Sequence, residues 1–165
     1  MRSEWIKRAL AALTAVTVMA VAACNKGPDP VAVAANAEAG KVFLEKTAKE
    51  EGVLPLEGGM YYKVVSSPTP TAPQPAVTDT VKVHYEGKLI DGTTFDSSYD
   101  RGVPAAFPLK GLVKAWQIAI PKMHKGDTWM LYVPAEMGYG DQAMGPIPAG
   151  SVLVFKIELI DIQPK

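Results

Sequence analysis

The pair Phe95-Asp96, an aromatic residue followed by a carboxylate, is the feature of this 165-residue chain that most clearly could do chemistry. A carboxylate at the rim of an apolar pocket can contact a polarised group of a bound molecule. From 81 to 89 the odd positions are apolar or small and the even positions are polar, which predicts a strand with one buried face. Asp91-Gly92 predicts a tight turn, because Gly tolerates a positive φ. The return strand then delivers Phe95 and Asp96.

The sequence offers little support for other kinds of catalytic site. His84 and His124 are its only histidines, and neither belongs to a Cys or acidic cluster at ligand spacing, so we expect no metal and no cofactor. His84 lies on the polar side of its strand and is expected to be solvated or structural. No Ser/His/Asp order and no phosphate-binding loop is present, which argues against hydrolase and nucleotide-binding functions.

Several further elements must position the pair. Residues 60–65 and 127–133 are expected to form strands, and 153–159 alternate Leu, Phe, Ile and Leu on one face of a last strand. Leu112, Val113, Trp116 and Ile120 recur at helical spacing and predict one short helix with an apolar face. Antiparallel strands with one short helix make an α+β domain.

These motifs, in this order, resemble the signature of the FKBP-type peptidyl-prolyl cis-trans isomerases. The resemblance covers roughly residues 60–163. It rests on Val83-His84-Tyr85, Gly87, Leu89, Asp91-Gly92, Phe95-Asp96-Ser97-Ser98, Gly111 to Trp116, Lys125-Gly126-Asp127, Tyr139-Gly140, Ile147-Pro148 and Leu153-Val154-Phe155. It implies a curved antiparallel sheet wrapped around the short helix, and rotation of X–Pro peptide bonds without covalent chemistry.

The resemblance also implies a site. Trp116 would form the floor of a proline pocket, Asp96 would contact the carbonyl of the twisting amide, and the Tyr139 hydroxyl would donate to a substrate carbonyl. The backbone N–H of Ile147 would hold the chain beside the proline. The remaining residues expected to bind substrate are Tyr85, Phe95, Phe107, Leu112, Val113 and Phe155.

Each of these residues also has an ordinary structural interpretation. Phe95, Trp116 and Phe155 could simply belong to a core. Asp96 could be a turn residue that accepts from Ser97 or Ser98, and Tyr139 could be a loop aromatic. Two positions depart from the family pattern at the pocket edge: Ala105 stands where many members have an aromatic, and Pro146 where an aliphatic residue is more common. These departures bear on substrate preference and on affinity for macrolide inhibitors.

The N-terminus resembles a bacterial lipoprotein signal. A basic start is followed by the apolar run 9–23, which is too short for a membrane-spanning helix of about 20 residues. Val21-Ala22-Ala23-Cys24 resembles a lipobox, so we expect residues 1–23 to be a signal peptide and Cys24 to be lipidated; the alternative is ordinary cleavage that leaves a free thiol. The resemblance also bears on location: the inner-membrane retention signal of such lipoproteins has Asp after the cysteine, whereas Asn25 stands here. We therefore expect the outer rather than the inner membrane of a bacterial envelope, with the domain facing the periplasm.

Residues 24–35 are expected to form a lipidated tether and 36–52 a short helix with Asn36 as its N-cap, followed by the isomerase domain at 60–165. The helix resembles the segment that precedes the catalytic domain in the macrophage-infectivity-potentiator branch. That branch has a dimerisation module upstream, for which no room is left after Cys24, so we expect a monomer.

Charge argues against a nucleic-acid partner. Residues 1–23 hold three of the 17 Lys+Arg and one of the 17 Asp+Glu, so the remainder carries 14 basic and 16 acidic residues, near −2. The segment 66–76 contains four prolines and is expected to be a surface loop, with a polyproline docking ligand as the alternative.

Three functions therefore compete. The first is an active isomerase that acts on proline-containing, incompletely folded polypeptides outside the cytoplasm. The second is a chaperone or binding module that uses the same cleft without turnover, and the third is a structural lipoprotein with a degenerate pocket. The presence of both Asp96 and Tyr139 favours the first.

Overall fold

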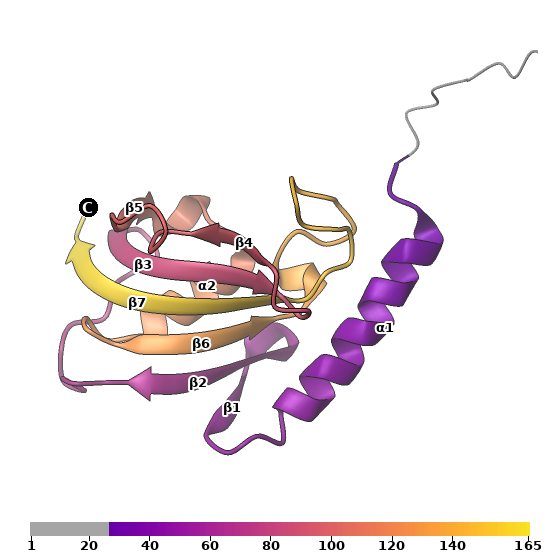
Figure 1. The fold of residues 1–165 in the computed structure, drawn as a ribbon. Coiled ribbons are helices and arrows are strands. Elements are labelled where there is room, and N and C mark those ends of the chain that lie inside the picture. The colour runs from indigo at the N-terminus through magenta and orange to yellow at the C-terminus, as the bar shows by residue number, and fades with distance from the viewer. Residues whose placement is uncertain (1–26) are drawn as a thin grey trace, which may run out of the picture.

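The computed structural model describes residues 27–165, and these form one curved antiparallel sheet with two helices (Figure 1). The expected signal peptide and the lipidation site Cys24 lie outside the described residues. Within 27–165 no helix is both long and apolar enough to span a membrane.

The seven strands follow the order β1-β2-β6-β7-β3-β4, and β5 pairs with β3 beside β4. All pairs are antiparallel. The strands are β1 Val53–Leu56, β2 Met60–Ser66, β3 Thr80–Leu89, β4 Thr94–Ser97, β5 Ala105–Pro108, β6 Thr128–Val133 and β7 Leu153–Gln163. The α+β class predicted from the sequence is confirmed.

The hairpin between β3 and β4 forms as the sequence predicts. Side chains on β3 alternate between buried and half-buried, so its apolar face points into the core. In the turn, the Asp91 carboxylate accepts from the Thr93 N–H at 2.8 Å and Gly92 has a φ of 88°. The return strand β4 therefore places the Phe95 ring over Gly87, on the inner face of β3.

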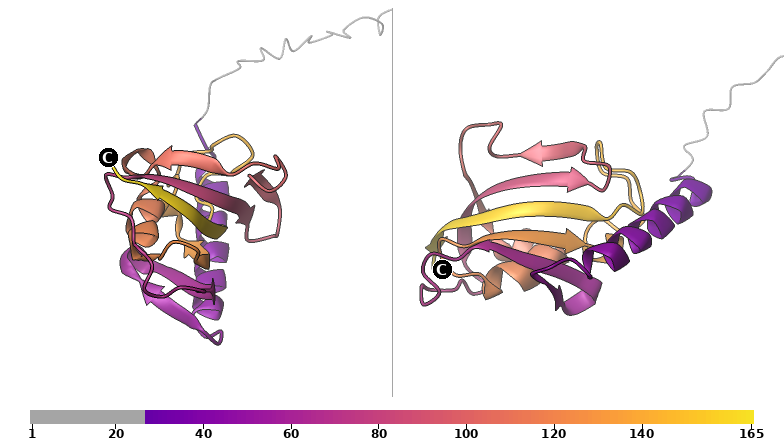
Figure 2. Two further views of the ribbon diagram at one scale, coloured as in Figure 1. Left: turned by 90° about the vertical axis from the view of Figure 1, so that its left-hand side faces the viewer. Right: turned by 60° about the horizontal axis from the view of Figure 1, so that its bottom comes forward.

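The short helix α2, Lys114–Ala119, packs against the inner face of the sheet (Figures 1 and 2). Ala115, Trp116 and Ala119 are its buried residues. They join a core that β3, β6 and β7 complete with Val81, Val83, Leu131, Leu153, Ile157 and Leu159, all fully buried.

The first helix, α1, begins earlier than the sequence suggested. It spans Pro30–Thr47, with Asp29 as the N-cap accepting from the Val31 N–H at 3.0 Å. The prediction of a tether up to residue 35 and an N-cap at Asn36 is therefore wrong. Pro30 does not interrupt the helix because the first helical position needs no N–H donor. The helix also ends at Thr47, before the expected stop at Gly52.

Two short strands were not expected. β1 lies at the sheet edge, where Pro55 is tolerated because an edge strand leaves N–H groups unpaired. β5 is only four residues long, too short for a clear alternating pattern.

The proline-rich segment is a loop from residue 67 on, as expected, whereas Ser66 is the last residue of β2; the loop is attached to the rest of the domain. Ser67 Oγ donates to Asp127 Oδ1 at 2.6 Å, the Lys125 N–H donates to the Pro73 carbonyl at 2.9 Å, and Gln74 Nε2 donates to the Lys122 carbonyl at 3.0 Å. This attachment favours the loop interpretation over a freely presented docking ligand.

Candidate active site

A cavity of about 320 Å³ opens between the β3–β4 hairpin, α2 and β7. It brings together all of the predicted site residues except Ile147, and adds Gly111. Its lining consists of Tyr85, Phe95, Asp96, Phe107, Gly111, Leu112, Val113, Trp116, Tyr139 and Phe155. The walls are thus mostly aromatic and aliphatic, with one carboxylate and two phenolic hydroxyls.

Trp116 occupies the centre of the aromatic cluster. Only 4% of its surface is exposed, and its ring meets those of Tyr85 and Phe155 edge-on at centroid distances of 5.3 and 5.4 Å. The indole Nε1 has no hydrogen-bond acceptor in the described part of the chain. The floor of the cavity is therefore an aromatic surface that is packed between neighbouring rings and suits an apolar ring.

Gly87 on β3 allows two aromatic walls to approach the strand. A Cβ at this position would lie 2.5 Å from the Phe95 ring and 3.0 Å from the Phe155 ring. Phe95 and Phe155 meet edge-on at 5.7 Å over this gap. A glycine in a strand interior often marks such a close approach.

At the rim, Asp96 is held by two partners. The Tyr85 hydroxyl donates to Asp96 Oδ2 at 2.5 Å, and Arg101 forms an ion pair with Asp96 Oδ1. Arg101 Nη2 also donates to the Tyr85 hydroxyl at 2.8 Å, which closes a three-membered network. The carboxylate is oriented in this way at the edge of an apolar cavity.

The same network sets the protonation states. Burial alone would raise the pKa of Asp96, but hydrogen bonds from Tyr85 and Arg101 outweigh it and hold that pKa below its usual value. Burial and the hydrogen bond to Asp96 raise the pKa of Tyr85. Asp96 is therefore ionised and Tyr85 protonated throughout the neutral range.

Arg101 is the functional residue that sequence reasoning missed. It lies five positions after Asp96 in an exposed loop, where a charged residue is normally a solvated surface group. The signal that could have indicated the ion pair of Arg101 with Asp96 is their short separation along the chain. Arg101 lies in the loop that directly follows the strand of Asp96.

Ile147 is not placed as expected. Its side chain is buried, and its N–H donates to the Met144 carbonyl at 3.0 Å within a tight turn in which the Met144 N–H donates back at 2.9 Å. The prediction of a free substrate donor at Ile147 is contradicted, because the turn already uses that group. Val113, directly before α2, lines the cavity instead, and no acceptor for its N–H is present in residues 27–165.

Behind the rim, Ser98 fastens the end of the hairpin to β3. Its fully buried hydroxyl accepts from the Tyr85 N–H at 2.7 Å, and it lies 2.9 Å from His84 Nδ1. The His84 ring stacks on Tyr99 at 4.7 Å. These contacts give His84 a structural role, as the sequence indicated.

Comparison with known proteins agrees with this geometry. Residues 72–160, just over half of the chain, match the family described as FKBP-type peptidyl-prolyl cis-trans isomerase. The chain belongs to this family. Residues 6–64 also match the domain that lies amino-terminal to FKBP-type isomerases, so this domain is represented over a longer stretch than the sequence had indicated, and the stretch includes α1.

FKBP-type relatives occur among bacterial proteins. The chain is 44% identical over 131 residues to "Peptidyl-prolyl cis-trans isomerase Mip" of Coxiella burnetii, covering 79% of this chain and 56% of that one. It is 38% identical over 129 residues to "Outer membrane protein MIP" of Legionella longbeachae, covering 78% and 54%. The crystal structure of FkpA from Escherichia coli superimposes with a TM-score of 0.76 and 41% identity, covering 80% and 61%. The chain thus spans little more than half the length of these curated relatives.

Proposed function

We propose that this chain is an active peptidyl-prolyl cis-trans isomerase. The observation that carries the proposal is the aromatic cavity with a carboxylate fixed and ionised at its rim. A passive apolar groove needs no such carboxylate. FKBP-type family membership and the name of the Coxiella relative support the same activity.

The reaction requires rotation about an amide bond, against a barrier of about 18–20 kcal/mol that arises from resonance. The planar amide carries more charge separation than the twisted one, so an apolar cavity weakens resonance and favours rotation. Only interactions that are stronger in the twisted state than in the planar state raise the rate. The cavity therefore needs both a dry surface for the proline ring and a polar contact at its edge.

The residues divide between these two tasks. The proline ring sits over Trp116, between Phe95, Phe107 and Phe155. Asp96 makes the electrostatic contact to the carbonyl of the rotating amide, and Arg101 keeps Asp96 in place. The Tyr139 hydroxyl and the Val113 N–H donate to substrate carbonyls on either side of the proline.

The substrates are proline-containing, unfolded or partly folded polypeptides in the bacterial envelope. The name of the Legionella relative, "Outer membrane protein MIP", supports an envelope location. We further propose that Cys24 carries a lipid that anchors a periplasm-facing monomer, at the outer rather than the inner membrane. Incorporation of a labelled fatty acid that is lost in Cys24→Ala tests the anchor, and sedimentation of residues 25–165 as a single species of monomer mass tests the oligomeric state.

Activity is tested by following cis-to-trans exchange of Leu-Pro and Phe-Pro peptides with residues 25–165. Uncatalysed exchange takes tens to roughly hundreds of seconds, so acceleration is readily detected. A macrolide that fills the cavity should abolish it. Peptide binding without acceleration would instead identify a chaperone or binding module, and neither binding nor acceleration would identify a structural lipoprotein.

A further inference from the structure

Helix α1 touches the domain at residues 149–152, which follow the Met144–Ile147 turn and precede β7. Asn36 Nδ2 donates to the Ala149 carbonyl at 2.9 Å, although the two residues are 113 positions apart. In Figure 1 the loop that precedes β7 lies between the end of the sheet and α1. The contact therefore joins the N-terminal helix to residues 149–152.

Two glycines show how closely the helix and this segment approach. A Cβ on Gly40 would lie 2.5 Å from Val152 Cγ2, and a Cβ on Gly150 would lie 2.9 Å from the Val33 carbonyl oxygen. Gly40, Ala149 and Val152 are all buried. Helix and segment thus interlock without space for a larger side chain.

Residues 149–152 are hydrogen-bonded to the turn that carries Tyr139. The Gly150 N–H donates to the Gly140 carbonyl at 2.9 Å, and the Gly140 N–H donates to the Ala135 carbonyl at 2.7 Å. Tyr139 lines the proposed proline cavity. A continuous set of contacts therefore runs from Asn36 through Ala149 and Gly150 to Tyr139.

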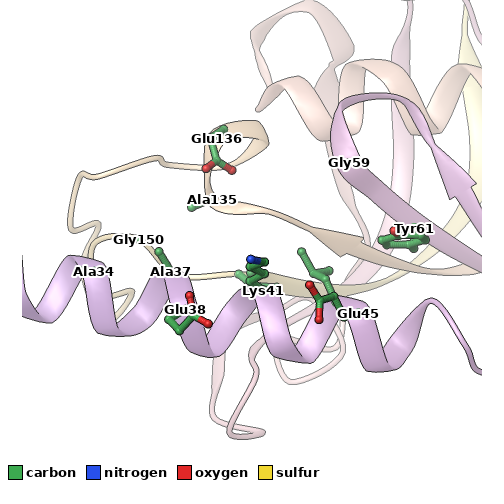
Figure 3. A pocket seen from close by; sticks show the side chains of 12 residues that line it. Ala34, Ala37, Glu38, Lys41, Glu45, Gly59, Tyr61, Ala135, Glu136 and Gly150 are labelled. Atoms are coloured by element: carbon green, nitrogen blue, oxygen red, sulfur yellow. The ribbon is translucent and has the colours of Figure 1, made fainter.

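Part of α1 does not pack directly against the domain. A groove of about 610 Å³ separates part of the helix from the 3-10 turn Ala135–Met137 and from Tyr61 (Figure 3). Lys41 and Glu45 of α1 and Glu136 of the 3-10 turn are among the charged residues that line this groove. Beyond the groove, Phe43 approaches Tyr132 at a ring distance of 6.3 Å.

We infer that α1 is a positioning element of the active site, in which Asn36 and Gly40 hold residues 149–152 and so fix the turn bearing Tyr139. The inference rests on the proposed function, since a fixed Tyr139 matters only if it contacts substrate. It assigns α1 a role beyond that of a spacer between the membrane and the catalytic domain.

Amide hydrogen exchange of the full mature chain tests the inference without reference to activity. Asn36→Ala removes the donor, and Asn36→Asp keeps the shape but cannot donate to the Ala149 carbonyl. Loss of one such bond should speed exchange of residues 139–152 about fivefold, with β3 and β7 unchanged. Gly40→Val should do the same, whereas Ala39→Val, on the exposed side of the same helix turn, should have no effect.

Peptide kinetics give the second readout. The Asn36 variants and Gly40→Val should raise KM with kcat unchanged, because a looser turn weakens substrate binding without altering the rim carboxylate. Exchange in 139–152 equal to that of the wild type, or acceleration spread evenly over the domain, would overturn the inference. If the wild type lacks isomerase activity but the exchange pattern appears, the proposed function fails while the mechanical coupling stands.

Discussion

At the scale of single residues, Asp96 and Trp116 share one cavity and have separable tasks. Asp96 lies at the rim, where the proposed function places its contact with the amide, whereas Trp116 packs edge-on against the Tyr85 and Phe155 rings of the cavity walls. Removing a group that interacts more strongly with the twisted than with the planar amide lowers kcat. Removing a group that interacts equally with the twisted and the planar amide weakens substrate affinity. The two residues can therefore be told apart by kinetics.

Asp96→Ala should lower kcat about tenfold, equivalent to ~1.4 kcal/mol, with a much smaller change in peptide affinity. Trp116→Ala should impair both turnover and binding. The measurement is exchange kinetics of a Phe-Pro peptide combined with a binding titration. Equal losses of kcat and affinity in Asp96→Ala would argue against the role given to the carboxylate.

Arg101→Ala should reduce kcat/KM by about threefold, since its ion pair with Asp96 is exposed to solvent and its hydrogen bond to Tyr85 belongs to the same network. In the double variant Asp96→Ala/Arg101→Ala the loss due to the Arg101 change should be smaller than in Arg101→Ala alone. A double-mutant cycle measures this coupling. Fully additive losses would show that Arg101 contacts substrate independently of Asp96.

The pH profile should be flat across the neutral range. The pKa of Asp96 lies below its usual 3.8, so its stabilising network is intact above that value and is lost only as pH falls further. The pKa of Tyr85 lies above 10.0, so its hydroxyl remains a donor at neutral pH. We expect constant kcat/KM from about pH 5 to about pH 9. An inflection near pH 6 to 7 would implicate a histidine and contradict this assignment.

At the scale of elements, β3 supports the site on its inner face and pairs with three other strands. Gly87 is the point where this strand makes room for Phe95 and Phe155. The two rings cannot keep their edge-on contact if the strand carries a side chain there. The pocket wall therefore depends on one small residue within a regular strand.

Gly87→Ala should displace Phe95, raise KM for proline peptides several-fold and lower the melting temperature, because overpacking costs about 1–3 kcal/mol. Lys82→Ala, on the outer side of the same strand, is the matched control and should leave KM unchanged. Kinetics and thermal unfolding of both variants provide the comparison. Normal KM in Gly87→Ala would mean that the ring moves without consequence for the pocket.

At the scale of the whole molecule, β6 is contacted at both ends. The proline-rich loop is bonded to Asp127, directly before β6, and Phe43 of α1 packs near Tyr132 at the far end of the strand. Asp127 holds the loop there. This carboxylate is only 2% exposed, and it accepts from Ser67 Oγ at 2.6 Å and from the His124 N–H at 2.9 Å. The loop thus contributes to stability and does not touch the cavity.

Asp127→Ala should lower the free energy of unfolding by about 1–3 kcal/mol, because two donors lose a buried acceptor. Asp161→Ala, which removes an exposed ion pair with Lys125, should leave the free energy of unfolding nearly unchanged, because exposed ion pairs contribute little. Urea unfolding measures both. An unchanged midpoint for Asp127→Ala would show that water replaces the carboxylate, and kcat/KM should be unaffected in either variant.

The sequence alone determined the local parts of this protein. The alternation along 81–89, the Asp91-Gly92 turn and the helical spacing around Trp116 depend on neighbours along the chain, so they predicted β3, β4 and α2 correctly. The family signature then allowed nearly all cavity residues to be named in advance. The prediction starts helix α1 too late because it assigns Pro30 to the tether, although the first helical position accepts proline.

Only the tertiary structure decided which polar groups are free and which are already paired. Whether the Ile147 N–H is available depends on its turn partner Met144, and whether Asp96 stands alone depends on where the loop brings Arg101. The contact of Asn36 with Ala149 joins residues 113 positions apart, and no local pattern encodes such a distance. Hydrogen bonds between distant segments are set by the packing of the whole chain, which is why the carboxylate at the rim could be predicted and its partners could not.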